Sequence, residues 1–116
     1  MAMLSMSVAA FQSANAGSAI ATDGHGNTVY TFGHAKAVEI RRALEMARMH
    51  GLTDARIIGA TDVTGYGAIA VARKGTGSIL GTVLGCPSRA EAEHRAIEGC
   101  LRGGGTDPKV RVEWHG

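Results

Sequence analysis

One pattern occurs twice in this chain of 116 residues, and it restricts the possible folds more than any other feature. Residues 66–101 predict a strand, a glycine-rich turn, a second strand and then a helix. A fainter copy comes earlier, where Asp-Gly and Gly-Asn pairs within residues 23–27 indicate a hairpin turn. The letters RALE at 42–45 return as RAIE at 95–98. We therefore interpret the chain as one structural unit written twice.

The repeat predicts an α+β fold made of two ββαβ units, residues 17–60 and 66–114, in a single domain spanning 17–116. We expect the two units to pair into one antiparallel sheet of about six strands, with both helices on one face. The second hairpin should be about four residues longer than the first, because the repeat offset grows along the chain. The expected strands are 18–22, 28–32, 56–60, 67–72, 78–84 and 109–114, and the expected helices are 35–50 and 88–102.

Both expected helices have recognisable ends and a stripe of apolar residues. Gly51 stands where a left-handed residue would end the first helix. Ser88 and Glu91 have the spacing of a capping box at the start of the second. Helical spacing predicts which residues face the sheet. In the first helix these are Ala37, Ile40, Leu44 and Ala47. In the second they are Ala90, Ile97 and Leu101, and Ala96 and Cys100 add to the same face.

Composition excludes several classes of protein. Apolar residues make up 45% and charged residues 19%, which is ordinary for a globular domain. The formal net charge of +2 is small, and Lys and Arg form no run, so nucleic acid is not an expected partner. No apolar stretch approaches the roughly 20 residues that a membrane-spanning helix needs.

Residues 1–16 allow two interpretations. The apolar run followed by Ala14-Asn15-Ala16 is typical of the end of a secretory leader, although no Lys or Arg precedes it. The alternation of residues 4–10 is typical of a strand. The first interpretation predicts a secreted or periplasmic protein, and the second predicts a cytoplasmic one.

Candidate chemistry is sparse, and the sequence predicts no catalytic residue, metal site or cofactor. The histidines lack the i, i+4 spacing of a helical zinc site, and no CxxC occurs. Cys86 and Cys100 flank the second helix, about 20 Å apart, so an internal disulfide is not expected. A thiol-dependent enzyme built around Cys86 and His94 remains the least favoured alternative.

Three segments together resemble a bacterial family described only as domain of unknown function 4189. They are YGAIAV at 66–71, PSRAEAE at 87–93 and AI followed by Cys100 at 96–100. The resemblance implies a duplicated fold and export, and it supplies no chemistry. Members of that family usually have a second cysteine in the strand after the helix, paired with the helix-end cysteine. Residues 107–114 contain none, so that bridge is missing here.

These observations favour a non-catalytic protein-interaction module, best interpreted as an inhibitor or a toxin-immunity-type binder whose partner is another protein, such as a bacterial toxin domain. The sheet face away from the helices should present Tyr30, Tyr66 and Trp114 as anchors, with His25 at a hairpin tip. Two alternatives remain open. The aromatic residues instead cover the sheet or join a homodimer, or the protein is an exported factor that acts on a host or cell-envelope target.

Overall fold

The computed structural model describes residues 17–116, so both interpretations of residues 1–16 lie outside the described residues. All six expected strands and both expected helices are present, and the first hairpin has its predicted bounds. In chain order the elements are β1 (Ser18–Thr22), β2 (Thr28–Phe32), α2 (Lys36–Met49), β3 (Arg56–Thr61), β4 (Tyr66–Lys74), β5 (Gly77–Cys86), α3 (Arg89–Arg102) and β6 (Thr106–His115).

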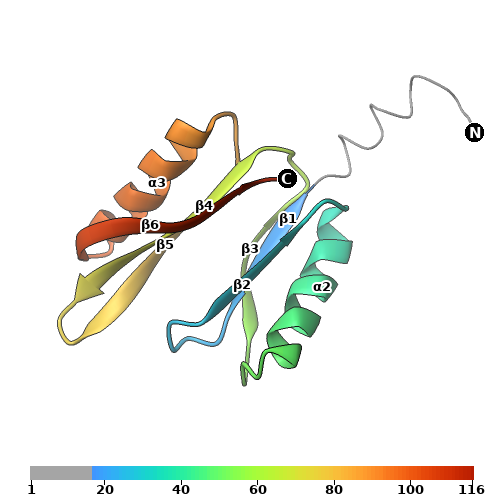
Figure 1. Cartoon of the computed structure of the whole chain (residues 1–116), viewed down its shortest axis with the longest axis horizontal. Coiled ribbons are helices and arrows are strands. Elements are labelled where there is room, and N and C mark those ends of the chain that lie inside the picture. Colours follow the sequence, from blue (N-terminus) through green and yellow to red (C-terminus); the bar gives the residue numbers. More distant parts are fainter. Residues whose placement is uncertain (1–16) are drawn as a thin grey trace, which may run out of the picture.

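The strands form two antiparallel three-stranded sheets, so the prediction of one six-stranded sheet is wrong. The first sheet has the order β2-β1-β3, and the second has the order β5-β4-β6. Helix α2 packs on the first sheet and α3 packs on the second. Figure 1 shows the two sheets lying between the two helices. The helices therefore cover opposite outer faces of a sandwich, not one shared face.

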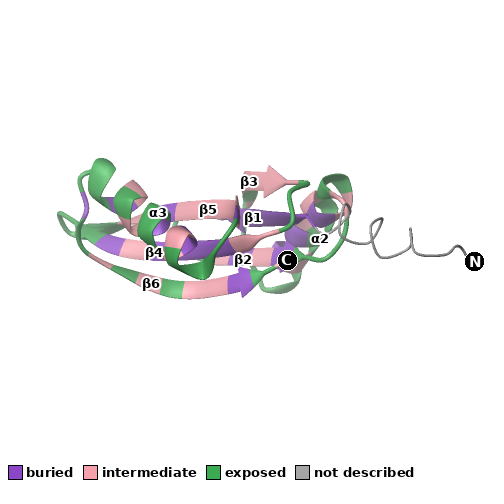
Figure 2. Ribbon diagram, turned by 90° about the horizontal axis from the view of Figure 1, so that it is seen from above, coloured by how far each residue is buried: buried purple, intermediate pink, exposed green. Residues whose placement is uncertain are grey.

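The sheets pack face to face because both faces of each sheet are apolar. Ala19 and Ala21 in β1 face α2, whereas Ile20 between them belongs to a different buried cluster. That cluster joins Ile20 with Ile69 and Trp114 of the second sheet. Leaving each isoleucine in water would cost about 1.5–3 kcal/mol. Two packed sheets bury these side chains, and Figure 2 shows the central strand β1 buried along its length.

The two sheets repeat each other in detail. Each central strand has an irregular register with its third strand at the same point, between Ile20 and Ala21 in the first sheet and between Ile69 and Ala70 in the second. The residues left over by these bulges are Ile58 and Arg111. The segments after the helices also match, since Asp54 in the turn before β3 and Asp107 at the start of β6 both have a positive φ, 56° and 59°.

The helix ends behave largely as predicted. Ser88 Oγ accepts a hydrogen bond from the main-chain nitrogen of Glu91 at 3.1 Å. The Glu91 carboxylate pairs with Arg95 and so supplies no second half of the capping box. Gly51 and Gly104 have φ values of 78° and 89° and end the two helices in the left-handed conformation, which costs glycine nothing.

The predicted buried stripes are only partly correct. Of the first, Ala47 is buried but Ala37 is exposed; of the second, Ala90 and Leu101 are exposed. Small residues face the sheets because the backbones approach closely: a Cβ atom on Gly81 would collide with the carbonyl oxygen of Ala96. The fully buried helix residues are Glu39, Ala43 and Ala47 in α2, and Ala92, Ala96 and Cys100 in α3.

Candidate functional site

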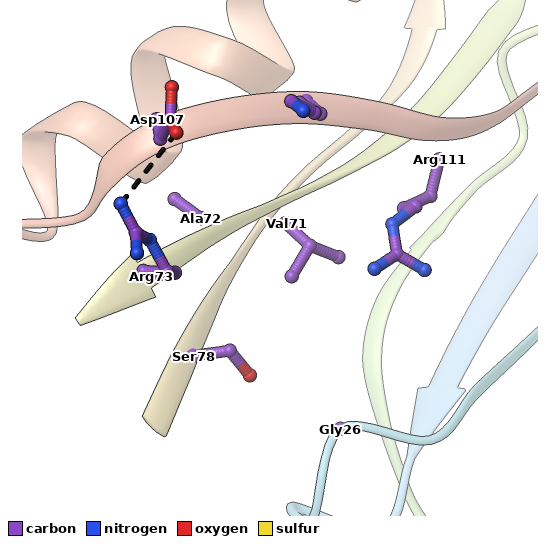
Figure 3. Close-up of a pocket in the computed structure, with 8 residues that line it drawn as sticks. Gly26, Val71, Ala72, Arg73, Ser78, Asp107 and Arg111 are labelled. Atoms are coloured by element: carbon purple, nitrogen blue, oxygen red, sulfur yellow. Dashed lines mark ion pairs between the residues drawn. The ribbon is translucent and has the colours of Figure 1, made fainter. Parts of the chain in front are cut away.

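A groove of about 550 Å³ lies at the far end of the second sheet, next to the β1–β2 turn. It exists because the two hairpins differ in length: β4 and β5 have 9 and 10 residues, whereas β1 and β2 have 5 each. The second sheet therefore continues where the first one ends. In Figure 3, side chains of β4 and β6 and the turn at Gly26 surround this space. The lining residues are Gly26, Val71, Ala72, Arg73, Ser78, Asp107, Lys109 and Arg111.

The β6 bulge makes Arg111 a lining residue of the groove. Ile69 pairs with Val112 and Ala70 pairs with Val110, so Arg111 is the extra residue between them. Bulges commonly re-aim a side chain beside a functional site. The equivalent bulge residue of the first sheet, Ile58, packs against the core between the sheets. Equivalent bulges therefore place an apolar side chain in the core in the first sheet and a cation in the groove in the second sheet.

The groove is positively charged. Arg73, Lys109 and Arg111 contribute three cations, and Asp107 contributes one carboxylate, which leaves a net charge of +2. Arg73 and Asp107 form an exposed ion pair at 3.7 Å. Within residues 17–116, neither Lys109 nor Arg111 forms an ion pair. Two cationic side chains in one hollow are thus free to bind an anionic group.

The rim beside the groove is a turn with hydrogen bonds between its own residues. The Asp23 carboxylate accepts hydrogen bonds from the side-chain amide of Asn27 at 2.8 Å and from the main-chain nitrogen of His25 at 2.7 Å. The amide of Asn27, followed by the His25 N–H, holds the pKa of Asp23 below its ordinary value. His25 is exposed and adjoins Gly26, so this predicted site residue lies at the edge of the groove.

The predicted aromatic residues occupy two separate places. Trp114 is only 7% exposed and stacks on Tyr30 with ring centroids 4.3 Å apart, between the two sheets. Tyr66 packs instead with the core under α3 and stacks on His115 at 4.3 Å. The other sheet thus covers the face that was expected to be free. Protein binding by these aromatic residues stays a prediction.

Sequence reasoning overlooked Glu39, a fully buried carboxylate in the first turn of α2. Arg42 Nη1 donates to both carboxylate oxygens at 2.9 and 3.0 Å, and His34 Nδ1 lies 2.9 Å from Oε2. The Thr31 hydroxyl donates to the main-chain oxygen of Glu39 at 3.0 Å. Burial, the largest influence, would raise the pKa of Glu39, but the contacts of its carboxylate with His34 and Arg42 outweigh it and leave that pKa lowered. The second unit has Ala92 at the equivalent helix position, so this cluster belongs to the first unit alone.

The two cysteines are packed thiols. Cys86 and Cys100 are free and buried in the cluster under α3, as the helix geometry predicted. Burial raises the pKa of both thiols, and for Cys86 the nearby charge of Arg95 opposes this only in part. His94 is exposed on α3, whereas Cys86 is buried. In the part of the chain that the structure describes, no group of three or more His, Cys, Asp or Glu side chains is placed to hold a metal ion.

Comparisons with protein-family models, with curated proteins and with solved structures give no match for this chain. The resemblance to domain of unknown function 4189 therefore stays a prediction. Neither helix of residues 17–116 has the length and apolar character needed to cross a membrane. Function is accordingly inferred from the geometry of the site.

The groove residues gave only a faint signal in the sequence. Asp107, Lys109 and Arg111 alternate along the last strand, a pattern that indicates charges on one side of it. The bulge at Arg111 and the overhang of the second sheet leave no trace in a single sequence. Residues 73–77 read as an ordinary hairpin turn, but Arg73 is a strand residue that pairs with Ser78 at the wall of the groove.

Proposed function

We propose that this protein is a non-catalytic protein-interaction module, of the inhibitor or immunity type, that binds its partner through the basic groove. The observation that carries the proposal is the presence of Lys109 and Arg111, two cations without an ion pair, in one hollow. Holding like charges together without a counter-charge does not help folding, whereas it provides a complementary surface for an acidic partner.

The chemistry of the groove suits a protein surface. Val71 supplies apolar contact area, and Arg111 supplies the fork of N–H donors that is enriched at protein interfaces. A stable interface covers about 800 Å² on each partner, so the groove would be the centre of a larger contact. The β1–β2 turn and the β4–β5 hairpin border it and would complete that surface.

Charge reversal in the groove tests the proposal. The double variant Lys109→Glu/Arg111→Glu should lose the partner that the wild-type protein captures from lysate of the source organism. The matched control Arg41→Glu/Arg56→Glu changes the net charge equally at exposed residues outside the groove and should retain that partner. A partner held equally by the groove variant and by the control would show that binding occurs elsewhere.

A further inference from the structure

We infer that the groove takes an extended acidic segment of the partner, with two carboxylates placed two residues apart. This inference rests on the proposed function and adds the chemistry of the bound segment. Lys109 and Arg111 are themselves two residues apart on β6, and because Arg111 is the bulge residue both of them line the groove. Alternate side chains of an extended chain repeat at about 6.6 Å. A segment of the type Glu-x-Glu therefore offers one carboxylate to each cation.

The Arg73–Asp107 ion pair of the groove limits how many acidic residues the segment can have. Asp107 lines the same groove two residues before Lys109, and its carboxylate is 3.7 Å from Arg73. A third carboxylate on the segment would face the Arg73–Asp107 ion pair, in which the cation already has a partner, and would gain no free cation. A neutral or basic residue suits that position. The groove thus selects two acidic residues flanked, on the side of Asp107, by a residue that is not acidic.

A protein segment fits this groove better than a nucleic acid backbone does. Among the described residues that line it, none is aromatic, so it has no platform on which bases could stack. Asp107 would also oppose a continuous row of phosphates. The half-buried Val71 on the floor of the groove instead matches the aliphatic parts of side chains between two carboxylates.

The experiment uses a fluorescein-labelled peptide containing one Glu-Thr-Glu segment and the full chain. Fluorescence anisotropy should show binding that weakens with added salt and falls about tenfold or more in Lys109→Ala/Arg111→Ala, because two charge pairs are lost. The control Arg41→Ala/Arg56→Ala should bind as the wild type does. A peptide with a third alternate Glu should bind no more tightly than the first.

A carbodiimide cross-link locates the peptide. This reagent joins a carboxylate to a neighbouring amine, and the chain has lysines at 36, 74 and 109 only. The cross-link should form mainly at Lys109. Lys109→Arg, which keeps the charge but removes the amine, should lose the cross-link. Equal labelling of Lys36 and Lys74, or preferential binding of an oligonucleotide of the same charge, would overturn the inference.

The two proposals fail separately. If the groove variant loses the captured partner while the acidic peptide does not bind the wild-type protein, the proposed function stands and the acidic segment is wrong. If the partner also binds the groove variant, the groove is not the binding site and both proposals fail.

Discussion

Removing Arg42, which is 42% exposed, should destabilise the protein more than removing the fully buried carboxylate to which it binds. In Arg42→Ala the Glu39 carboxylate keeps its buried place but loses the Nη1–H that serves both of its oxygens. Breaking a buried pair in this way costs about 3–5 kcal/mol. Because solvent reaches the site of Arg42, we expect about 2–3 kcal/mol.

Substituting Glu39 instead of Arg42 leaves no charged group buried. In Glu39→Ala, the side chains of Arg42 and His34 are partly exposed and can be hydrated again. The second unit already has alanine at the equivalent position, Ala92, which packs fully buried. We therefore expect a loss of only about 1 kcal/mol, comprising hydrogen bonds and a favourable helix N-terminal charge. The double variant should be more stable than Arg42→Ala alone.

Urea unfolding followed by circular dichroism measures these free energies of unfolding, and Arg95→Ala is the matched control. Arg95 is the counterpart of Arg42 in the second unit, and its partner Glu91 is partly exposed. The loss should be about 0.3–0.5 kcal/mol. If Arg42→Ala costs no more than this control, or if Glu39→Ala costs more than Arg42→Ala, the reasoning about the buried charge is refuted.

The same cluster fixes how stability responds to acid. The pKa of Glu39 in the folded protein lies below its ordinary value near 4.5, so the ionised form stabilises the fold. This contribution is fully present above the ordinary value and is lost as the pH falls through the lowered folded pKa. Glu39→Ala should therefore show a weaker fall in stability over this acidic range than the wild type. Equal acid dependence of the two proteins would contradict the assignment.

Three further outcomes follow from the packing. Gly81→Ala should unfold or severely destabilise the protein because its Cβ meets helix backbone, whereas Gly99→Ala, which meets only ordinary contacts, should stabilise it by up to about 1 kcal/mol in thermal unfolding. Gly67→Ala should displace the indole of Trp114 and shift its fluorescence to longer wavelength; an unchanged spectrum would contradict the burial of this single tryptophan. The two buried thiols should react slowly with a thiol reagent at neutral pH until urea unfolds the chain, and rapid reaction in the native protein would show that their burial is wrong.

Much of the local structure was predictable because its causes are local. Glycines and Asp23 define the first turn, Ser88 caps the second helix, and the strands between them contain mostly apolar residues. The second hairpin was predicted too short, because Arg73 and Lys74 read as turn residues. They continue β4 instead, and only residues 75 and 76 make the turn.

The packing of the sheets depends on contacts between distant residues, which a local pattern does not contain. The alternation of Ala19, Ile20 and Ala21 shows that successive side chains face opposite sides, yet each one is apolar. The sequence therefore indicates that both faces of β1 are buried. It does not indicate that the second sheet packs on the face opposite to α2. The burial of Glu39 could not be predicted for a similar reason. Small residues occur on more than one side of this helix, so the sequence does not decide which side packs on the sheet.

Reversing the charges of both the groove and the peptide is the most direct test of the groove as the binding site. Anisotropy titrations would compare the Glu-Thr-Glu peptide with a Lys-Thr-Lys peptide on the wild-type protein and on Lys109→Glu/Arg111→Glu. The wild type should prefer the acidic peptide, and the charge-reversed groove should prefer the basic one, each by about tenfold at low salt. If both proteins prefer the same peptide to the same extent, the ligand binds outside the groove and the account of this site is wrong.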